Sequence, residues 1–200
     1  MAKVLYIKAH PRKPEVSNTL QLANAFLNEY KLLNPEDTMD VIDLYEDPNI
    51  RFLDESMIED MFSRKDNIMM DYAKKFTEYD KYVIAAPFWN LSFPAILKAY
   101  FDYITYAGIT FKYTENGSVG LLNDRPRKAM YIVSRGGYYS DGPMQAFEHG
   151  EKYIRTLLNF FGITDISTLK LELTNVLMGE ELQNARESAY KDAREVAKSF

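Results

Sequence analysis

The sequence predicts an α/β fold, in which five parallel strands form an open, doubly wound sheet with helices on both faces. Apolar runs of strand length alternate with segments of helical periodicity along the chain. The run 82–86 is apolar without a break and is ended by Pro87, as expected of a buried strand in a parallel sheet. No Gly-rich turn follows the first strand, which argues against a dinucleotide-binding fold.

The N-terminal segments are expected to supply two strands and one helix. Residues 3–9 form an apolar run that is too short for a signal peptide and predicts the first strand. Ser17 or Asn18 is suited to cap the helix that follows, and Asn34-Pro35 would end it. Residues 38–44 alternate apolar and polar side chains, which indicates a strand at the edge of the sheet.

Residues 46–79 form a longer connection than a simple crossover needs. Two helices are expected within it, around 54–62 and 67–76. The four methionines of these helices are more typical of an adaptable core than of a binding surface. The extra length is consistent with a lid or with a contact between subunits.

The central strand, at 81–86, is expected to lead into a helix and then a hairpin. The helix is predicted at 92–107, with Ser92 as its cap. The segment 109–123 contains Asn116-Gly117, which is a strong hairpin signal between two alternating segments. We therefore expect an inserted β-hairpin after this helix.

The C-terminal part supplies the last two strands. A strand at 127–134 and a Gly-rich loop precede a helix at 144–161, which Gly162 ends. The final strand is expected at 168–173 and the final helix at 180–199. Five principal strands without a dinucleotide-type turn favour the order 2-1-3-4-5, which is the flavodoxin-like order.

Composition limits the classes of function. The 200 residues fit a single domain, 1–200, and the absence of cysteine excludes disulfides and thiolate chemistry and is compatible with a cytoplasmic protein. A net charge of −5 with mixed signs favours neither nucleic acid nor a membrane surface as a partner. No run is long enough to span a bilayer. The two histidines, His10 and His149, lie far apart without an acidic cluster, so no metal site is expected.

Three loops should converge at one edge of the sheet, because strands one, three and four are neighbours in the expected order. These loops are 10–19, 87–91 and 134–143, at the edge where open α/β sheets bind ligands. The first ends at a helix N-terminus and could hold an anion, although simple capping explains it equally well. The second offers a flat aromatic wall or an ordinary buried crossover. The third has Gly136-Gly137, which permits close backbone approach or forms an ordinary turn. Together they describe a pocket for a phosphorylated planar cofactor, and FMN fits.

Four motifs give the chain a specific resemblance over nearly its whole length. They are Ala86-Pro-Phe-Trp-Asn-Leu91, Phe111-Lys-Tyr-Thr-Glu-Asn-Gly117, Ser134-Arg-Gly-Gly137 and Phe161-Gly-Ile-Thr-Asp165. With these motifs in this order, the chain resembles the family of FMN-dependent NADH-azoreductases and NADH:quinone oxidoreductases. The resemblance implies a homodimer, with substrate above the flavin near the subunit interface.

The resemblance also implies which residues contact the cofactor. Near the FMN phosphate it places Ser17, Asn18 and Thr19, with His10 where the family often has Ser. Along the isoalloxazine it places Pro87, Phe88, Trp89, Asn90 and Leu91. Beside the pyrimidine edge and the ribityl chain it places Ser134, Arg135, Gly136 and Gly137. On the substrate side it suggests Tyr113.

The expected function is that of an oxidoreductase. Electrons from NADH or NADPH would pass through one flavin site to quinones and aromatic azo compounds, by a ping-pong mechanism. Flavin N5 would carry the hydride, so no protein residue is expected to be catalytic. The alternatives are an FMN-binding electron carrier and a regulatory subunit without small-molecule turnover.

Overall fold

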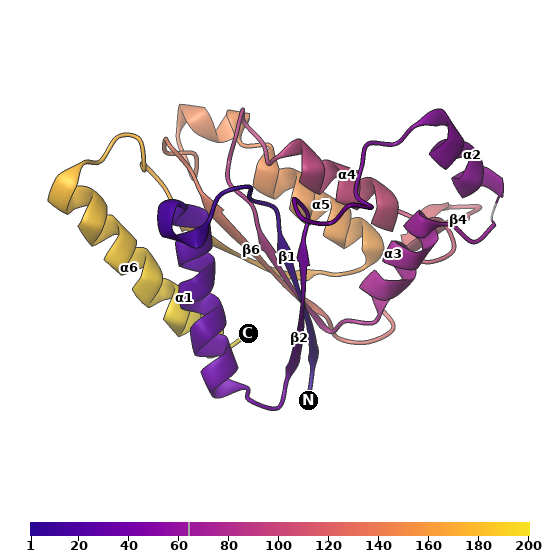
Figure 1. The fold of residues 1–200 in the computed structure, drawn as a ribbon, viewed down its shortest axis with the longest axis horizontal. Helices are drawn as coiled ribbons and strands as arrows, with labels where there is room; N and C mark the ends of the chain where they lie inside the picture. Colours follow the sequence, from indigo (N-terminus) through magenta and orange to yellow (C-terminus); the bar gives the residue numbers. More distant parts are fainter. Residues whose placement is uncertain (64) are drawn as a thin grey trace.

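A five-stranded parallel sheet forms the centre of the computed structural model, which describes residues 1–63 and 65–200 (Figure 1). Its strands are β1 (Lys3–Lys8), β2 (Thr38–Asp43), β3 (Lys81–Ala85), β6 (Lys128–Ser134) and β7 (Asp165–Leu171). They lie in the order β2-β1-β3-β6-β7, and every neighbouring pair is parallel. The predicted order 2-1-3-4-5 is therefore confirmed.

The helices connect these strands. They are α1 (Asn18–Leu33), α2 (Glu55–Ser63), α3 (Ile68–Thr77), α4 (Ala95–Ile104), α5 (Gly150–Phe161) and α6 (Gly179–Ala197), with short 3₁₀ turns at Pro14–Val16 and Pro143–Phe147. Ser17 caps α1 by accepting a hydrogen bond from the Leu20 N–H at 3.2 Å. Gly162 ends α5 in the left-handed conformation, with a φ of 100°. Both signals are readable in the sequence.

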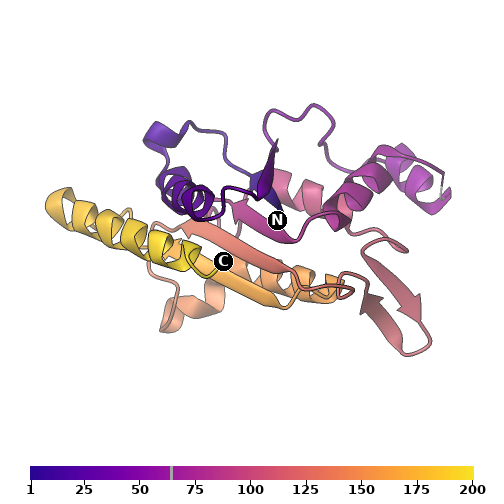
Figure 2. The same ribbon diagram turned by 90° about the horizontal axis from the view of Figure 1, so that it is seen from below.

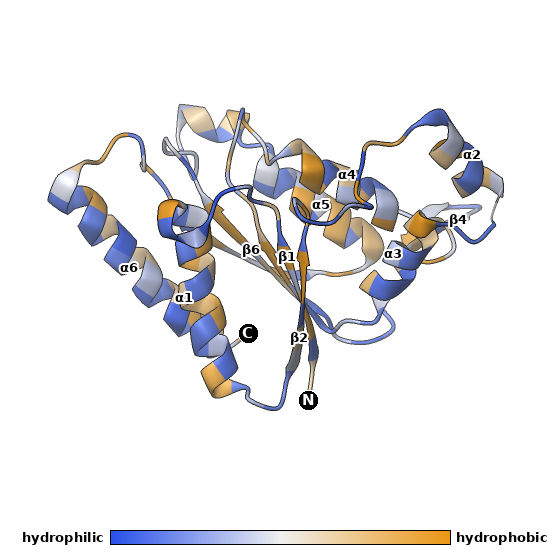
Figure 3. Ribbon diagram, viewed as in Figure 1, coloured by the Kyte–Doolittle hydropathy of each residue, from blue (hydrophilic) through white to orange (hydrophobic). Residues whose placement is uncertain are grey.

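Two apolar clusters pack against the sheet. One joins Val4 and Tyr6 of β1 to residues of α1 and α6, and the other joins Leu5 and Ile7 to residues of α3, α4 and α5. The last helix, α6, runs beside α1 (Figure 2). Neighbouring residues of β1 enter different clusters because successive side chains of a strand point in opposite directions. Figure 3 shows mostly hydrophobic strands beside helices that alternate hydrophobic and hydrophilic residues.

The methionines of the long connection belong to the interior, as predicted. Met57 and Met69 are buried, and Met61 and Met70 pack against the same cluster. Position 64, inside this connection, lies outside the described residues. None of the helices among residues 1–63 and 65–200 is long and apolar enough to cross a membrane.

Two helices are shorter than predicted. The helix after β3 begins at Ala95 rather than Ser92, because the backbone of Ser92 pairs with that of Trp89 and Pro94 occupies the N-cap position. The helix predicted at 144–161 is broken before Gly150. The Glu148 carboxylate accepts the N–H groups of Glu151 and Lys152, at 2.8 and 3.3 Å, and so starts a new helix there.

The last strand also begins earlier than the predicted 168–173. It runs from Asp165 to Leu171, because Asp165 already pairs with Lys128 at the start of β6. The alternation of leucines with charged residues from Leu169 marks only the part of β7 that is buried on one face.

The hairpin is present, but its turn is shifted by one residue. Strands β4 (Phe111–Thr114) and β5 (Gly117–Gly120) pair as a separate antiparallel sheet, with Thr114 opposite Gly117. The turn therefore consists of residues 115–116 rather than the predicted Asn116-Gly117. Gly117 alone takes a positive φ, 107°, whereas the predicted turn type requires one at two successive central residues.

Candidate functional site

The loops after β1, β3 and β6 meet at the carboxyl edge of the sheet, and the loop after β7 joins them. Two adjoining cavities of about 280 and 500 Å³ lie there, which we call together the rim cavity. The smaller is lined by His10, Arg12, Val16, Ser17, Asn18, Pro87, Phe88, Trp89, Ser134, Gly136, Thr174 and Asn175. The larger is lined by Phe88, Asn90, Leu91, Gly136, Gly137, Tyr139, Asn175 and Val176.

The smaller cavity has the character of an anion site. It lies at the N-terminus of α1, where helix geometry leaves N–H groups without carbonyl partners and the dipole is positive. Arg12 lines the cavity, and a second arginine, Arg186, donates a hydrogen bond from Nε to Asn18 Oδ1 at 3.0 Å. None of the described residues lining this cavity carries a carboxylate. Ser17 therefore caps the helix and also borders a site that favours a phosphate.

His10 is held in this cavity as a neutral side chain. Its Nδ1 accepts the Arg12 N–H at 3.0 Å, so the proton of the neutral ring lies on Nε2. Burial, reinforced by the nearby charges of Arg12 and Lys8, lowers the pKa of His10 to about 4. A neutral Nε2–H group can donate a hydrogen bond to an anion.

The loop after β3 forms a tight, strained turn. The N–H and carbonyl groups of Trp89 and Ser92 pair with each other, at 2.8 and 3.0 Å. Between them, Asn90 and Leu91 both have positive φ values, 49° and 69°, as in the type I′ turn. Asn tolerates this conformation, whereas Leu rarely adopts it. The N–H groups of these two central residues take no part in that pairing, and both residues border the larger cavity.

The two aromatic side chains of this loop have different surroundings. Phe88 is 9% exposed, borders both parts of the rim cavity and contacts the Tyr139 ring at a centroid distance of 4.6 Å. Trp89 is 41% exposed, borders only the smaller cavity and lies edge-on to His10 at 5.6 Å. Phe88 therefore forms the wall shared by both cavities, and Trp89 flanks the anion side.

The Gly-rich loop lies against the loop that follows β7. The carbonyls of Gly136 and Gly137 accept the N–H groups of Asn175 and Leu173, at 3.1 and 3.2 Å. A Cβ atom on Gly136 would lie 2.5 Å from Asn175 Nδ2, so a side chain at this position would displace the Asn175 side chain. Both glycines border the rim cavity, as do Pro87 and Ser134.

Three of the predicted site residues do not border the rim cavity. Thr19 is fully buried, and its hydroxyl pairs with Ser134 Oγ at 2.6 Å. Arg135 is buried among carboxylates behind the Gly-rich loop. Tyr113 lies on the hairpin, 75% exposed, and borders a separate hollow of about 550 Å³ with Lys74 and Lys112. Within one chain the structure does not bring Tyr113 together with the three loops.

The residues that the sequence reasoning missed come mainly from the loop after β7. Thr174 and Asn175 border the smaller cavity, and Asn175 and Val176 the larger. Tyr139, inside the Gly-rich loop, also contributes a wall. The predicted strand order contained the necessary signal, because it places the loop after the fifth strand next to the loop after the fourth.

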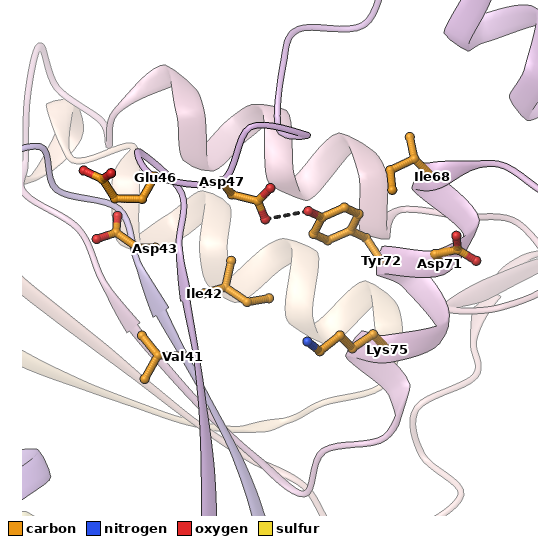
Figure 4. A pocket seen from close by; sticks show the side chains of 9 residues that line it. All are labelled: Val41, Ile42, Asp43, Glu46, Asp47, Ile68, Asp71, Tyr72 and Lys75. Atoms are coloured by element: carbon orange, nitrogen blue, oxygen red, sulfur yellow. Dashed lines mark hydrogen bonds between the residues drawn. The ribbon is translucent and has the colours of Figure 1, made fainter.

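A groove of similar volume elsewhere has the wrong charge for a phosphate. It measures about 470 Å³ and lies between β2 and α3, with Tyr72 donating a hydrogen bond to Asp47 at 2.5 Å (Figure 4). Its charged side chains are Asp43, Glu46, Asp47, Asp71 and Lys75. This excess of carboxylates would repel a phosphate. Charge and position at the carboxyl edge therefore distinguish the rim cavity from this groove, whereas cavity volume does not.

Comparison with known proteins gives a consistent set of relatives. A family model described as a flavodoxin-like fold matches residues 2–196. The chain is 48% identical to FMN-dependent NADH:quinone oxidoreductase 2 of Clostridium acetobutylicum and 46% identical to the FMN-dependent NADH:quinone oxidoreductase of Coprothermobacter proteolyticus, with 100% of each chain covered.

Solved structures extend this likeness to three dimensions. A crystal structure of an azoreductase from Bacillus anthracis matches with a TM-score of 0.91 and 35% identity, over 100% of both chains. An FMN-dependent NADH-azoreductase from the same species, in complex with FMN, matches with a TM-score of 0.86 and 32% identity, over 98% of both chains.

Proposed function

The chain belongs to the flavodoxin-like family of FMN-dependent NADH:quinone oxidoreductases and azoreductases, and from this premise we propose that residues 1–200 form one FMN-binding domain that oxidises NADH or NADPH and reduces quinones and aromatic azo compounds. We also infer a doubly wound arrangement, with α1 and α6 on one face of the sheet and α3, α4 and α5 on the other. This leaves the carboxyl edge open to a ligand.

One observation carries the proposal: a polar, carboxylate-free cavity at the N-terminus of α1 continues into a cavity walled by Phe88 and glycine backbone. The first part suits a phosphate, with Ser17 and His10 as donors. The second suits a planar ring system beside residues 87–91, with Gly136 and Asn175 bordering the junction between the two.

Bound FMN would supply the redox chemistry by accepting electrons from the nicotinamide and passing them to the acceptor. The chain's own residues bind and orient. The N–H groups of Asn90 and Leu91 are positioned to donate to a ring edge and to favour negative charge there. Thr19 and Arg135 lie behind the cavity wall and support it rather than contact the ligand.

Donor and acceptor are proposed to use the same site in turn, since no second nucleotide motif is readable in the sequence. Kinetics in which NADH and a quinone are both varied should then give parallel double-reciprocal lines. Intersecting lines would indicate a ternary complex and contradict the ping-pong scheme.

The direct test of the function uses the purified protein saturated with FMN and freed of excess. Under anaerobic conditions, NADH or NADPH should bleach the visible absorbance of the bound flavin, and a quinone or an azo dye should restore it. Bound flavin that neither nicotinamide reduces would instead support an electron carrier. A protein that takes up no FMN would overturn the proposal.

A homodimer and a cytoplasmic location complete the proposal. Tyr113 borders no part of its own rim cavity, so its proposed contact with substrate requires the site of a second copy. The cysteine-free composition is compatible with this location.

A further inference from the structure

Arg135 is a fully buried cation held by three carboxylates from separate parts of the chain. Its Nη2 lies 3.1 Å from Glu148 Oε1 and 3.2 Å from Glu151 Oε2, and its Nη1 lies 3.2 Å from Glu172 Oε1. Glu148 and Glu151 lie at the start of α5, and Glu172 follows β7 directly. With Arg155 and Lys170, which also contact Glu151, the six side chains carry balanced charge.

Glu172 connects this buried cation to the Gly-rich loop. While it contacts Arg135, its Oε1 accepts the Tyr139 N–H at 2.8 Å and its Oε2 accepts the Ser140 hydroxyl at 2.5 Å. The loop that contains Gly136 and Gly137 is therefore fixed at both ends, by the Arg135 backbone on one side and by Glu172 on the other.

Arg135 also contacts the second wall of the rim cavity. The centre of its guanidinium lies 5.4 Å from the centroid of the Phe88 ring, within the range of a cation–π contact. Phe88 N–H in turn donates to the carbonyl of Ser134 at 3.1 Å. One side chain thus joins the loops after β3, β6 and β7.

We infer that Arg135 is a positioning residue for the flavin. It acts through Glu172 and Phe88 to fix the Gly-rich loop and the Phe88 ring, two walls of the rim cavity, relative to each other. This rests on the proposed FMN site. It differs from the contact role that the sequence suggested, because Arg135 borders neither part of the cavity. Buried ion pairs contribute little net stability relative to apolar side chains, so the cluster's effect is expected in the geometry of the site.

Two variants break this connection at different points. Arg135→Lys keeps the charge but loses the planar fork that reaches three carboxylates. Glu172→Gln removes the negative charge that pairs with Arg135 and turns one loop-facing oxygen into an NH₂ donor, so Ser140 must reverse its hydroxyl to keep a hydrogen bond. Glu151→Gln is the matched control, because Glu151 contacts Arg135 equally closely but makes no hydrogen bond to the Gly-rich loop.

The experiment measures FMN binding to the flavin-free protein by fluorescence quenching, and the visible circular dichroism of the bound flavin. Unfolding of each flavin-free variant in urea reports stability separately. Arg135→Lys and Glu172→Gln should each weaken FMN binding about tenfold and alter the dichroism. The double variant should lose about as much as either single one, because both break the same link. Glu151→Gln should lower stability and leave FMN affinity and dichroism unchanged.

Unchanged FMN affinity in Glu172→Gln, or an equal loss in Glu151→Gln, would overturn the positioning role and leave a structural one. A wild-type protein that binds no FMN would overturn the proposed function itself, so the two failures are distinct. Glu172→Gln keeps the test decisive if Arg135→Lys does not fold.

Discussion

Leu91 holds a backbone conformation that its side chain disfavours, at a φ of 69° beside Asn90 at 49°. Glycine normally destabilises a chain relative to alanine, but at a left-handed position the order should reverse. We expect Leu91→Gly to be more stable than Leu91→Ala by about 1 kcal/mol. Urea unfolding of the two flavin-free variants checks this, and a less stable Leu91→Gly would contradict the strained turn.

His10 should make stability depend on pH. The folded-state pKa of about 4 lies below the ordinary value of 6.5, so between these values the unfolded chain binds a proton that the folded chain does not. The stability contributed by neutral His10 is present above pH 6.5 and is lost as the pH falls toward 4.

The measurement is urea unfolding of the flavin-free protein across this range, with His10→Asn compared to wild type. The variant should show a flatter dependence of the free energy of unfolding on pH. His149→Asn serves as a control at the other histidine. Identical slopes in His10→Asn and wild type would show that His10 is not held neutral.

The role of a single residue can be predicted from the sequence when it depends only on the residue type and its immediate neighbours. Ser17 and Gly162 are recognisable because a cap and a left-handed helix end each favour particular residue types. Leu91 carries no such signal, because its positive φ is imposed by the pairing of its neighbours. The burial of Arg135 depends on carboxylates 13, 16 and 37 residues away, which spacing alone cannot bring together.

The hairpin packs closely against the C-terminal end of α5. A Cβ atom on Gly120 would lie 2.2 Å from the carbonyl carbon of Phe161 and 2.5 Å from the Gly162 nitrogen, and both are backbone atoms. Gly120→Ala should therefore displace the hairpin from the end of α5 and lower the free energy of unfolding by about 1–3 kcal/mol.

Ser118→Ala, at an exposed position of the same strand, is the control and should change stability little. Hydrogen exchange would locate the effect, with faster exchange of the Leu122 N–H, which donates to the Phe161 carbonyl at 2.8 Å. Unchanged exchange and stability in Gly120→Ala would contradict the close packing.

Elements were predictable in type but less so in their limits. All five strands of the sheet are present near their predicted positions, although β7 begins at Asp165 rather than at the predicted 168. The break before Gly150 was not predictable, because it depends on the Glu148 carboxylate accepting the Glu151 N–H. The sequence does not indicate whether Glu148 points toward this N–H, toward Arg135 or toward solvent. A helix end that is set by one side-chain hydrogen bond leaves no periodic pattern in the sequence.

The assembled molecule should be a dimer formed through the side that carries α2 and the hairpin. Phe52, Phe62 and Tyr113 are 69, 75 and 75% exposed there, which is a large apolar area for a free surface. Light scattering should give twice the 23.2 kDa of one chain. Phe62→Ser with Tyr113→Ser should shift the mass toward the monomer.

Leu32→Ser is the control, since Leu32 is 77% exposed on α1, away from that side. It should leave the mass unchanged. A wild-type monomer at all concentrations would contradict the proposed dimer, and with it the proposed contact between Tyr113 and a substrate in the partner's site.

At the scale of the molecule, alternation of strands and helices was enough to give the sheet order and so the meeting of three loops. The same order places the loop after the fifth strand beside these three, and residues Thr174–Val176 of that loop form a further wall. One chain does not, however, place the hairpin over a rim cavity.

The acidic groove beside β2 also limits how that assembly can form. β2 is the outer strand of the sheet, and an outer strand presents unpaired backbone groups to any other strand. Asp43, Glu46 and Asp47 border this edge, so two copies joined strand to strand there would bring their carboxylates face to face. The carboxylates of the groove would therefore disfavour strand-to-strand association of two copies at the β2 edge.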